Sequence, residues 1–147
     1  MIGEGRDRLV NNKPWWKEVP EQVALGNTIK NCSISKCGKQ YYGAVGMWCG
    51  STAETTIQNN EIYDLSYSGI SIGWMWSPEP TPCRENIIDG IHIHHILNIL
   101  SDGGGIYMLG LQPGSKLINN HIHDGTLSVQ INRVTIETCR QTLYNTL

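Results

Sequence analysis

The sequence predicts an all-β fold, a parallel β-helix (solenoid) of about four coils. A pattern of three hydrophobic positions recurs four times with one spacing: Ile29-x-x-Cys32-x-Ile34, Ile57-x-x-Asn60-x-Ile62, Ile88-x-x-Ile91-x-Ile93 and Leu117-x-x-Asn120-x-Ile122. The first members are 28, 31 and 29 residues apart, and a fixed repeat of roughly 20–50 residues is typical of a solenoid. Each repeat has short β-branched runs with a period of two and no helical stripe. The repeating unit is therefore a coil of strands.

A second block, led by glycine, follows each of the first three patterns and predicts a further strand in each coil. The blocks are Gly43-Ala-Val-Gly-Met-Trp48, Gly69-Ile-Ser-Ile-Gly-Trp74 and Gly105-Ile-Tyr-Met-Leu-Gly110. No such block follows Asp124, and the repeat is lost from Gly125 onwards. We therefore interpret the chain as a partial solenoid.

The chain of 147 residues has room for one domain, which we divide into three parts. Residues 1–25 form an irregular N-terminal segment, in which Trp15 and Trp16 are expected to cover the open end of the core. Residues 26–124 form the coils. Residues 125–147 form a degenerate last coil or a tail.

The composition excludes several partners. A net charge of −2 with 16% charged residues indicates neither a nucleic acid nor a membrane surface as the partner. No apolar run approaches the roughly 18 residues of a membrane-spanning helix, and the start of the chain shows no secretory signal. The sequence alone leaves the localisation unknown.

The cysteines do not predict a metal or disulfide site. The five of them show no CxxC spacing and leave one unpaired in any disulfide scheme. Cys32 stands where the second and fourth repeats have asparagine, which predicts a small thiol buried in the stack. We expect no cofactor.

Stacking places equivalent residues of successive coils above one another, about 4.8 Å apart. Asn60 and Asn120 then share a column, in which their amides are expected to form hydrogen bonds from coil to coil. The isoleucines two positions later form the core column.

The positions beside this column point outward and hold His92, His94, His121 and His123 as a two-by-two grid. Such a grid binds a zinc-like ion only if the rings converge. Histidines on a sheet face usually do not converge, so no metal is predicted.

The position after this grid presents Lys36, Asp64, His95 and Asp124 in one column. The two aspartates lie two coils apart, about 10 Å between backbones. Inverting glycosidases hold their carboxyl groups about 6.5–9.5 Å apart, and His95 could orient either carboxylate. The alternative is that aspartate at a strand end is an ordinary turn residue.

Asp102 is the strongest candidate for an acid or base. It precedes three glycines in Ser101-Asp-Gly-Gly-Gly-Ile-Tyr107, and glycines beside a carboxylate let a ligand approach the backbone and the acid together. The alternative is a tight turn that Asp102 caps.

Four aromatic residues are the substrate-binding candidates: Trp74, Trp76, Tyr67 and Tyr107. Aromatic rings pack on the apolar faces of sugars while their polar rims stay in water. The alternative, which we favour for Trp48, is an aromatic stack of Trp48 and Trp74 at a corner that closes the core.

These segments resemble the right-handed parallel β-helix proteins of the pectin-lyase-like superfamily, above all bacterial glycan-degrading members. The markers are Asn60-Glu-Ile-Tyr-Asp64 and Asn120-His-Ile-His-Asp124, together with Tyr67-Ser-Gly-Ile-Ser-Ile-Gly-Trp74 and the segment from Ser101 to Tyr107. The resemblance covers residues 26–124. It implies a right-handed helix, action on a polysaccharide or oligosaccharide, and a secreted or periplasmic location. It also implies paired acids on one outer face, to which Asp102 is matched.

Three functions follow from this reading. The first is a glycoside hydrolase or a fragment of one, with Asp102 as acid or base and Asp64 or Asp124 as its partner. The second is a non-catalytic carbohydrate-binding or structural module, in which the aromatic residues matter and the carboxylates do not. The third and weakest is a polysaccharide lyase with Lys36 or His95 as the base. Open solenoid ends are also expected to favour self-association.

Overall fold

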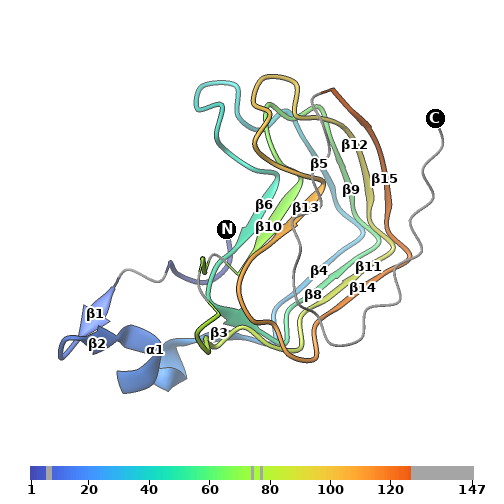
Figure 1. The fold of residues 1–147 in the computed structure, drawn as a ribbon. Coiled ribbons are helices and arrows are strands. Elements are labelled where there is room, and N and C mark those ends of the chain that lie inside the picture. Colours follow the sequence, from blue (N-terminus) through green and yellow to red (C-terminus); the bar gives the residue numbers. More distant parts are fainter. Residues whose placement is uncertain (6–7, 74, 77, 127–147) are drawn as a thin grey trace.

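The computed structural model describes residues 1–5, 8–73, 75–76 and 78–126, and it is an all-β parallel β-helix. Three parallel sheets form the sides of a triangular prism (Figure 1). The predicted fold class is therefore confirmed. None of the helices in this part of the chain has the length and apolar character needed to cross a membrane.

The three sheets contain one strand from each turn, in order along the prism. The first sheet contains β4 (Thr28–Lys30), β8 (Thr56–Gln58), β11 (Ile87–Asp89) and β14 (Lys116–Ile118). The second sheet contains β5 (Ser33–Ser35), β9 (Glu61–Tyr63), β12 (His92–Ile96) and β15 (His121–Gly125). The third sheet contains β6 (Met47–Cys49), β10 (Ile70–Ile72) and β13 (Ile106–Met108).

Within the described residues the prism therefore has three complete turns and two strands of a fourth. This is close to the predicted four coils. The third strand of the fourth turn would have to follow residue 126. The residues after 126 lie outside the part of the chain that the structure describes. Cys139 and all of the predicted tail (125–147) except residues 125 and 126 also lie outside the described residues.

The core is made of the columns that the repeat predicts. Ile57 and Ile88 are paired neighbours in the first sheet, as are Ile62 and Ile93 in the second, and all four are fully buried. Ile34 and Ile122 extend the second column at its two ends and are half-buried. Burial of a side chain of this size stabilises a fold by about 1.5–3 kcal/mol, so these columns are the main source of stability.

Three corners of each turn require a left-handed backbone. One column, for example, is Lys36, Asp64, His95 and Asp124, with φ between 50° and 59°. Two further columns of this kind are Asn31, Asn59, Gly90 and Asn119, and Gly26, Glu54, Glu85 and Gly114. Asparagine, aspartate and glycine tolerate this conformation best, which explains why they recur at the strand ends.

Buried asparagines join successive turns. Asn60 is 2% exposed; its Oδ1 accepts a hydrogen bond from the Cys32 N–H (2.8 Å), and its Nδ2 donates to the Ile29 carbonyl (3.0 Å). Asn120 makes the same two bonds one turn further on, to Ile91 and Ile88. The predicted coil-to-coil bonds thus exist, but their partners are backbone groups. The predicted burial of Cys32 is wrong, because its side chain is exposed in the first of the described turns.

Asn86 is the most enclosed of these asparagines and is fully buried. Its Oδ1 accepts from the Thr55 N–H (3.1 Å). Its Nδ2 donates to the Thr52 carbonyl (3.2 Å) and to Gln112 Oε1 (3.1 Å). Asn86 therefore ties its own turn to the turn before it and to the segment that follows β13.

A column of glycines lies where each turn enters the third sheet. A Cβ on Gly46 would lie 2.7 Å from the Gly69 carbonyl oxygen, and a Cβ on Gly69 would lie 2.6 Å from the Gly105 oxygen. A Cβ on Gly105 would meet Ile122 at 2.6 Å. A glycine directly before each strand of the third sheet is therefore required by the close approach of successive turns; in the first block this residue is Gly46 and not Gly43, which leads the block.

The N-terminal segment packs beside the prism and pairs with one edge of it. β1 (Leu9–Val10), β2 (Lys13–Pro14) and α1 (Trp15–Glu18) lie outside the triangle (Figure 1). They are followed by the 3-10 turn η1 (Pro20–Gln22) and by β3 (Ala24–Leu25), which pairs with β7 (Thr52–Ala53). Residues 2–4 bond to the backbone of Trp48, Gly50 and Ser51 and so cover the free edge of β6.

The expected cap made by two tryptophans is not what the structure shows. Trp15 is fully buried, but it packs within the N-terminal segment, where its Nε1 donates to the Gly5 carbonyl (3.0 Å). Among the described residues it is not part of the main core cluster, against which Ile2 packs instead. Backbone pairing, and not aromatic burial, closes this edge.

Candidate functional site

An aromatic pocket of about 590 Å³ lies against the outer face of the third sheet. The lining residues that matter for its chemistry are Trp48, Tyr67, Ser71, Trp76, Asp102 and Tyr107. We call this site the aromatic pocket.

The floor of the aromatic pocket follows from the alternation of side chains along the strands. Trp48, Ser71 and Tyr107 are the central residues of β6, β10 and β13 and are paired neighbours, while the residues on either side of them face the core. A serine between two large aromatic residues leaves a hollow in the middle of this row. Ser71 is 2% exposed, and its Oγ has no hydrogen-bond partner among the described residues. A buried hydroxyl that lacks a partner costs free energy.

One wall of the aromatic pocket forms where a long loop folds over the preceding turn. The Tyr67 hydroxyl donates a hydrogen bond to the main-chain carbonyl of Asp102, and the Leu97 N–H donates to the Tyr67 carbonyl (3.1 Å). Burial raises the pKa of the Tyr67 hydroxyl, and the nearby Asp102 carboxylate raises it further. Tyr67 therefore stays protonated and can donate. The Asp102 side chain is exposed at the rim.

The glycines after Asp102 have a packing role. Gly103, Gly104 and Gly105 are buried, and a Cβ on Gly103 would lie 2.3 Å from Ser68 Oγ and 2.8 Å from the Tyr67 ring. The glycines let the loop lie flat against the preceding turn. The structure thus explains them without a ligand.

Trp76 stands at the open side of the pocket, beside the Tyr107 ring of the floor. The ring of Trp76 lies 6.4 Å from that of Tyr107 at an angle of 60°, and Trp76 is 64% exposed. An exposed indole beside a phenol ring offers an apolar surface to a ligand. Trp74, the other tryptophan that we predicted to contact substrate, lies outside the described residues.

The remaining predicted site residues lie elsewhere, at the corner after the second sheet. Asp64, His95 and Asp124 form the predicted column there, and none of them lines the aromatic pocket. His95 Nε2 lies 3.9 Å from Asp124 Oδ2, while Asp64 Oδ2 lies 3.7 Å from Lys39 Nζ. The structure thus brings Asp102, Tyr67, Trp76 and Tyr107 together and separates them from this column.

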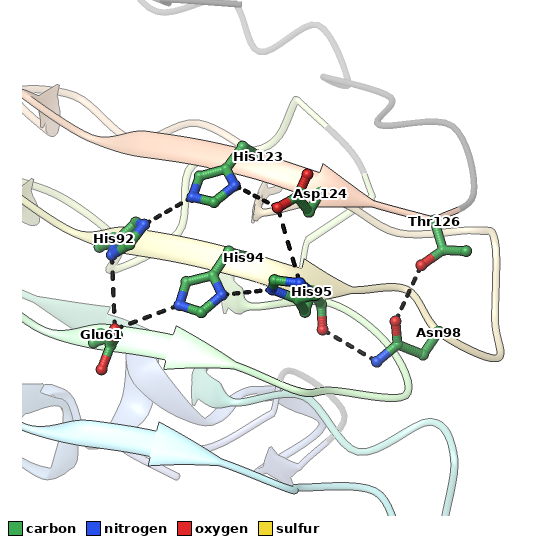
Figure 2. A network of polar contacts seen from close by, with 8 residues as sticks. All are labelled: Glu61, His92, His94, His95, Asn98, His123, Asp124 and Thr126. Carbon is green, nitrogen blue, oxygen red and sulfur yellow. Dashed lines mark hydrogen bonds and ion pairs between the residues drawn. The ribbon is translucent and has the colours of Figure 1, made fainter. Parts of the chain in front are cut away.

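A second cluster covers the outer face of the second sheet, and we call it the histidine patch. It contains Glu61, His92, His94, His95, His121, His123 and Asp124. Figure 2 shows six of these side chains in a closed circuit of polar contacts, from Glu61 through His92, His123, Asp124, His95 and His94 back to Glu61. The rings converge, which is the condition that the sequence could not test.

The pKa shifts in the histidine patch have clear causes. Burial lowers the pKa of His92, and the neighbouring histidines lower it further, against the opposite effect of Glu61. The hydrogen bond from His123 lowers the pKa of Asp124. Two sets of three side chains could hold a metal ion, because their ligand atoms lie within 4.8 Å of one another: His92, His121 and His123, and Glu61, His92 and His94.

Sequence reasoning missed three functional candidates. Ser71 carries no motif, although the alternation in its strand would have placed it outward. Trp48 was assigned to closing the core, but it lines the aromatic pocket. Glu61 occupies the same outward column as His92 and could have been grouped with the histidines by register.

Comparison with known proteins agrees with this architecture. A family model described as "Right handed beta helix region" matches residues 23–143. A solved structure described as "Glycoside hydrolase" is similar with a TM-score of 0.69 and 33% sequence identity, and the match covers 70% of this chain. The chain spans 17% of the length of that structure. No curated protein matches the chain.

Proposed function

Because the chain belongs to the right handed beta helix region family, we propose that it is a carbohydrate-active β-helix and that the aromatic pocket binds a polysaccharide or oligosaccharide. The main observation behind this proposal is that one pocket of about 590 Å³ is lined by Trp76, Tyr107, Ser71 and Asp102. The similarity to a solved structure described as a glycoside hydrolase, 33% identical over 70% of this chain, supports the same substrate class.

The pocket offers the contacts that a sugar ring needs. The faces of Trp76 and Tyr107 can cover its apolar C–H surface while the hydroxyl groups stay in contact with polar atoms. The Ser71 hydroxyl has no hydrogen-bond partner among the described residues, and the Asp102 carboxylate can accept hydrogen bonds from sugar hydroxyls at the rim. Few charges and several aromatic faces favour a neutral or weakly charged glycan.

The finer proposal is hydrolysis, with Asp102 as the general acid or base. Most glycoside hydrolases use two carboxyl groups, about 5–5.5 Å apart for retention or about 6.5–9.5 Å apart for inversion. Among the described lining residues, Asp102 is the single carboxylate. Asp64 and Asp124 lie at the corner after the second sheet and do not line the pocket, so among the described residues we assign no second carboxyl group to it.

This single carboxylate also favours the second candidate, a non-catalytic carbohydrate-binding module. In that case the aromatic rings carry the affinity and Asp102 is a rim residue. The two candidates share the pocket and the ligand class, and they differ only in whether Asp102 is needed for turnover.

The experiment is to incubate the purified chain with a panel of plant and algal polysaccharides and to analyse soluble products by mass spectrometry and binding by affinity electrophoresis. The pocket variants are Asp102→Asn and Trp76→Ala. Their matched controls are Asp64→Asn, a carboxylate outside the pocket, and Tyr41→Ala, an aromatic residue that is 81% exposed and does not line it.

Hydrolysis predicts oligosaccharides with an added water, lost in Asp102→Asn and kept in Asp64→Asn. Binding alone predicts no products and a loss of retention in Trp76→Ala, with Asp102→Asn and Tyr41→Ala unchanged. Unsaturated products would indicate a lyase. If folded Trp76→Ala binds every glycan as the parent chain does, the assignment of the pocket is wrong.

A further inference from the structure

We propose that His92, His121 and His123 form a binding site for a divalent transition-metal ion of the zinc type on the outer face of the second sheet. This site is separate from the aromatic pocket and does not depend on the proposed carbohydrate function.

The strands concentrate imidazoles at this one place. All five histidines of the chain are in β12 and β15. Each strand carries a His-x-His pair, and the period of two puts both members of a pair on the same face. The parallel register then sets His92 beside His121 and His94 beside His123, with ring centroids 5.3 Å apart in both pairs.

The ligand atoms of His92, His121 and His123 are already close to coordinating positions. They lie within 4.8 Å of one another, and His92 Nε2 is 2.8 Å from His123 Nε2. Zn–N bonds of about 2.0–2.1 Å in tetrahedral geometry place ligand nitrogens about 3.4 Å apart. A slight separation of His92 from His123 and a rotation of His121, whose side chain is exposed, would satisfy this geometry.

Two carboxylates lie beside the proposed ligands, and Asp124 orients His123 through a hydrogen bond. Asp124 Oδ2 lies 2.8 Å from His123 Nδ1, and Glu61 Oε1 lies 3.7 Å from His92 Nδ1. The Asp124 carboxylate holds the proton on His123 Nδ1, which leaves the His123 Nε2 lone pair for a metal ion. Without an ion, the Nε2 atoms of His92 and His123 at 2.8 Å must share a proton. A metal ion would replace that proton and bind both atoms.

The other set of candidate ligands suits a metal less well. His94 Nδ1 contacts His95 Nδ1 at 2.7 Å, and the His94 ring is stacked on Tyr63 with centroids 5.1 Å apart. Its Nε2 faces Glu61 at 3.4 Å, so Glu61 is shared between His92 and His94. We therefore assign Glu61 and Asp124 to the outer shell and the three imidazoles to the ion.

The donor set selects the kind of ion. Imidazole suits zinc, copper and nickel, whereas calcium and magnesium require oxygen ligands. Three protein ligands on a partly exposed face leave the fourth tetrahedral position to water or to a ligand from solution.

The experiment titrates the untagged protein with Zn²⁺ in a calorimeter and with Co²⁺ in a spectrophotometer, where tetrahedral coordination gives strong visible absorption. The site predicts one ion per chain. His121→Ala and His123→Gln should each weaken binding by more than the roughly 10–100-fold that loss of an outer-shell partner costs. Asp124→Asn, a positioning variant, should weaken binding within that range and keep the visible spectrum.

The matched control is His95→Asn, which removes an imidazole of the histidine patch outside the proposed set and suits the left-handed corner at φ 50°. The affinity of the His95→Asn variant for Zn²⁺ should equal that of the parent protein. The proposal is overturned if binding depends on His94 and Glu61 while His121→Ala is neutral. It is also overturned if the folded protein takes up several ions weakly and every histidine variant reduces uptake equally, since that is adventitious surface binding only.

Discussion

Replacing Asn86 with alanine is the sharpest test of how the turns are held together. The side chain is fully buried and makes three hydrogen bonds, to Thr55, Thr52 and Gln112, with lengths of 3.1–3.2 Å. Alanine removes all three bonds. It also leaves a buried backbone N–H, a buried carbonyl and a buried amide oxygen with one partner fewer.

The expected loss follows from these contacts. A hydrogen bond contributes about 0.5–1.5 kcal/mol net, and a buried group left without a partner costs about 1–3 kcal/mol. Three bonds in a fully enclosed site therefore give a loss of about 3–5 kcal/mol in the free energy of unfolding. This is a large share of the roughly 5–15 kcal/mol that holds an ordinary domain together.

Urea unfolding followed by far-ultraviolet circular dichroism measures this loss. With an m value of about 2 kcal/mol/M, in the middle of the range for small proteins, the midpoint should fall by about 1.5–2.5 M while the m value stays the same. The matched control is Asn120→Ala. Asn120 makes two bonds of the same kind at 2.9 and 3.0 Å but is only half-buried.

Asn120→Ala should therefore cost about 1–2 kcal/mol, because water can reach the groups that it leaves behind. A loss in Asn86→Ala that is no larger than the loss in Asn120→Ala would refute the reasoning. Burial of the asparagine side chain would then not determine how much its hydrogen bonds contribute to the free energy of unfolding.

Two further predictions concern packing and pH. Gly69→Ala should destabilise the fold by about 1–3 kcal/mol in the same urea assay, because the new Cβ would lie 2.6 Å from the Gly105 carbonyl oxygen. Gly43→Ala, with nothing within 4 Å of its Cβ, should change stability by less than about 0.5 kcal/mol; equal losses would contradict this reading. Burial raises the pKa of the Cys49 thiol to about 11. The stability that this shift contributes is fully present below the unfolded pKa of about 8.5 and is lost as the pH rises through 11. Cys49→Ala should therefore show a smaller drop in melting temperature between pH 8 and pH 10.5 than the parent chain, and an equal drop would count against the shift.

Much of the fold could be predicted because a solenoid repeats one structural unit at a nearly constant spacing along the chain. The spacing from Ile57 to Ile88 fixes which residues stack, and a period of two fixes which of them face inward. The outward grid of His92 and His121 followed from the same counting. Burial of Cys32 was predicted wrongly because the pattern does not say which turn is at an end.

The candidate site was less predictable because it depends on the parts that do not repeat. The loop that carries Asp102 and the segment that carries Trp76 reach the same pocket only through the path of the backbone, which no spacing reveals. The convergence of His92 and His123 depends on side-chain torsions. The pairing of Ile2 with the edge of β6 joins two segments with no shared pattern.

The left-handed corners of the prism have a consequence for natural variation and for engineering. One corner column holds Lys36, Asp64, His95 and Asp124 on almost the same backbone angles, so a cation, a carboxylate and an imidazole are all compatible with the chain shape there. Mutations at these positions change the exterior and leave the interior undisturbed when the new residue tolerates a positive φ. Related chains should diverge there first, and a combinatorial library restricted to these corners should retain a high proportion of folded members.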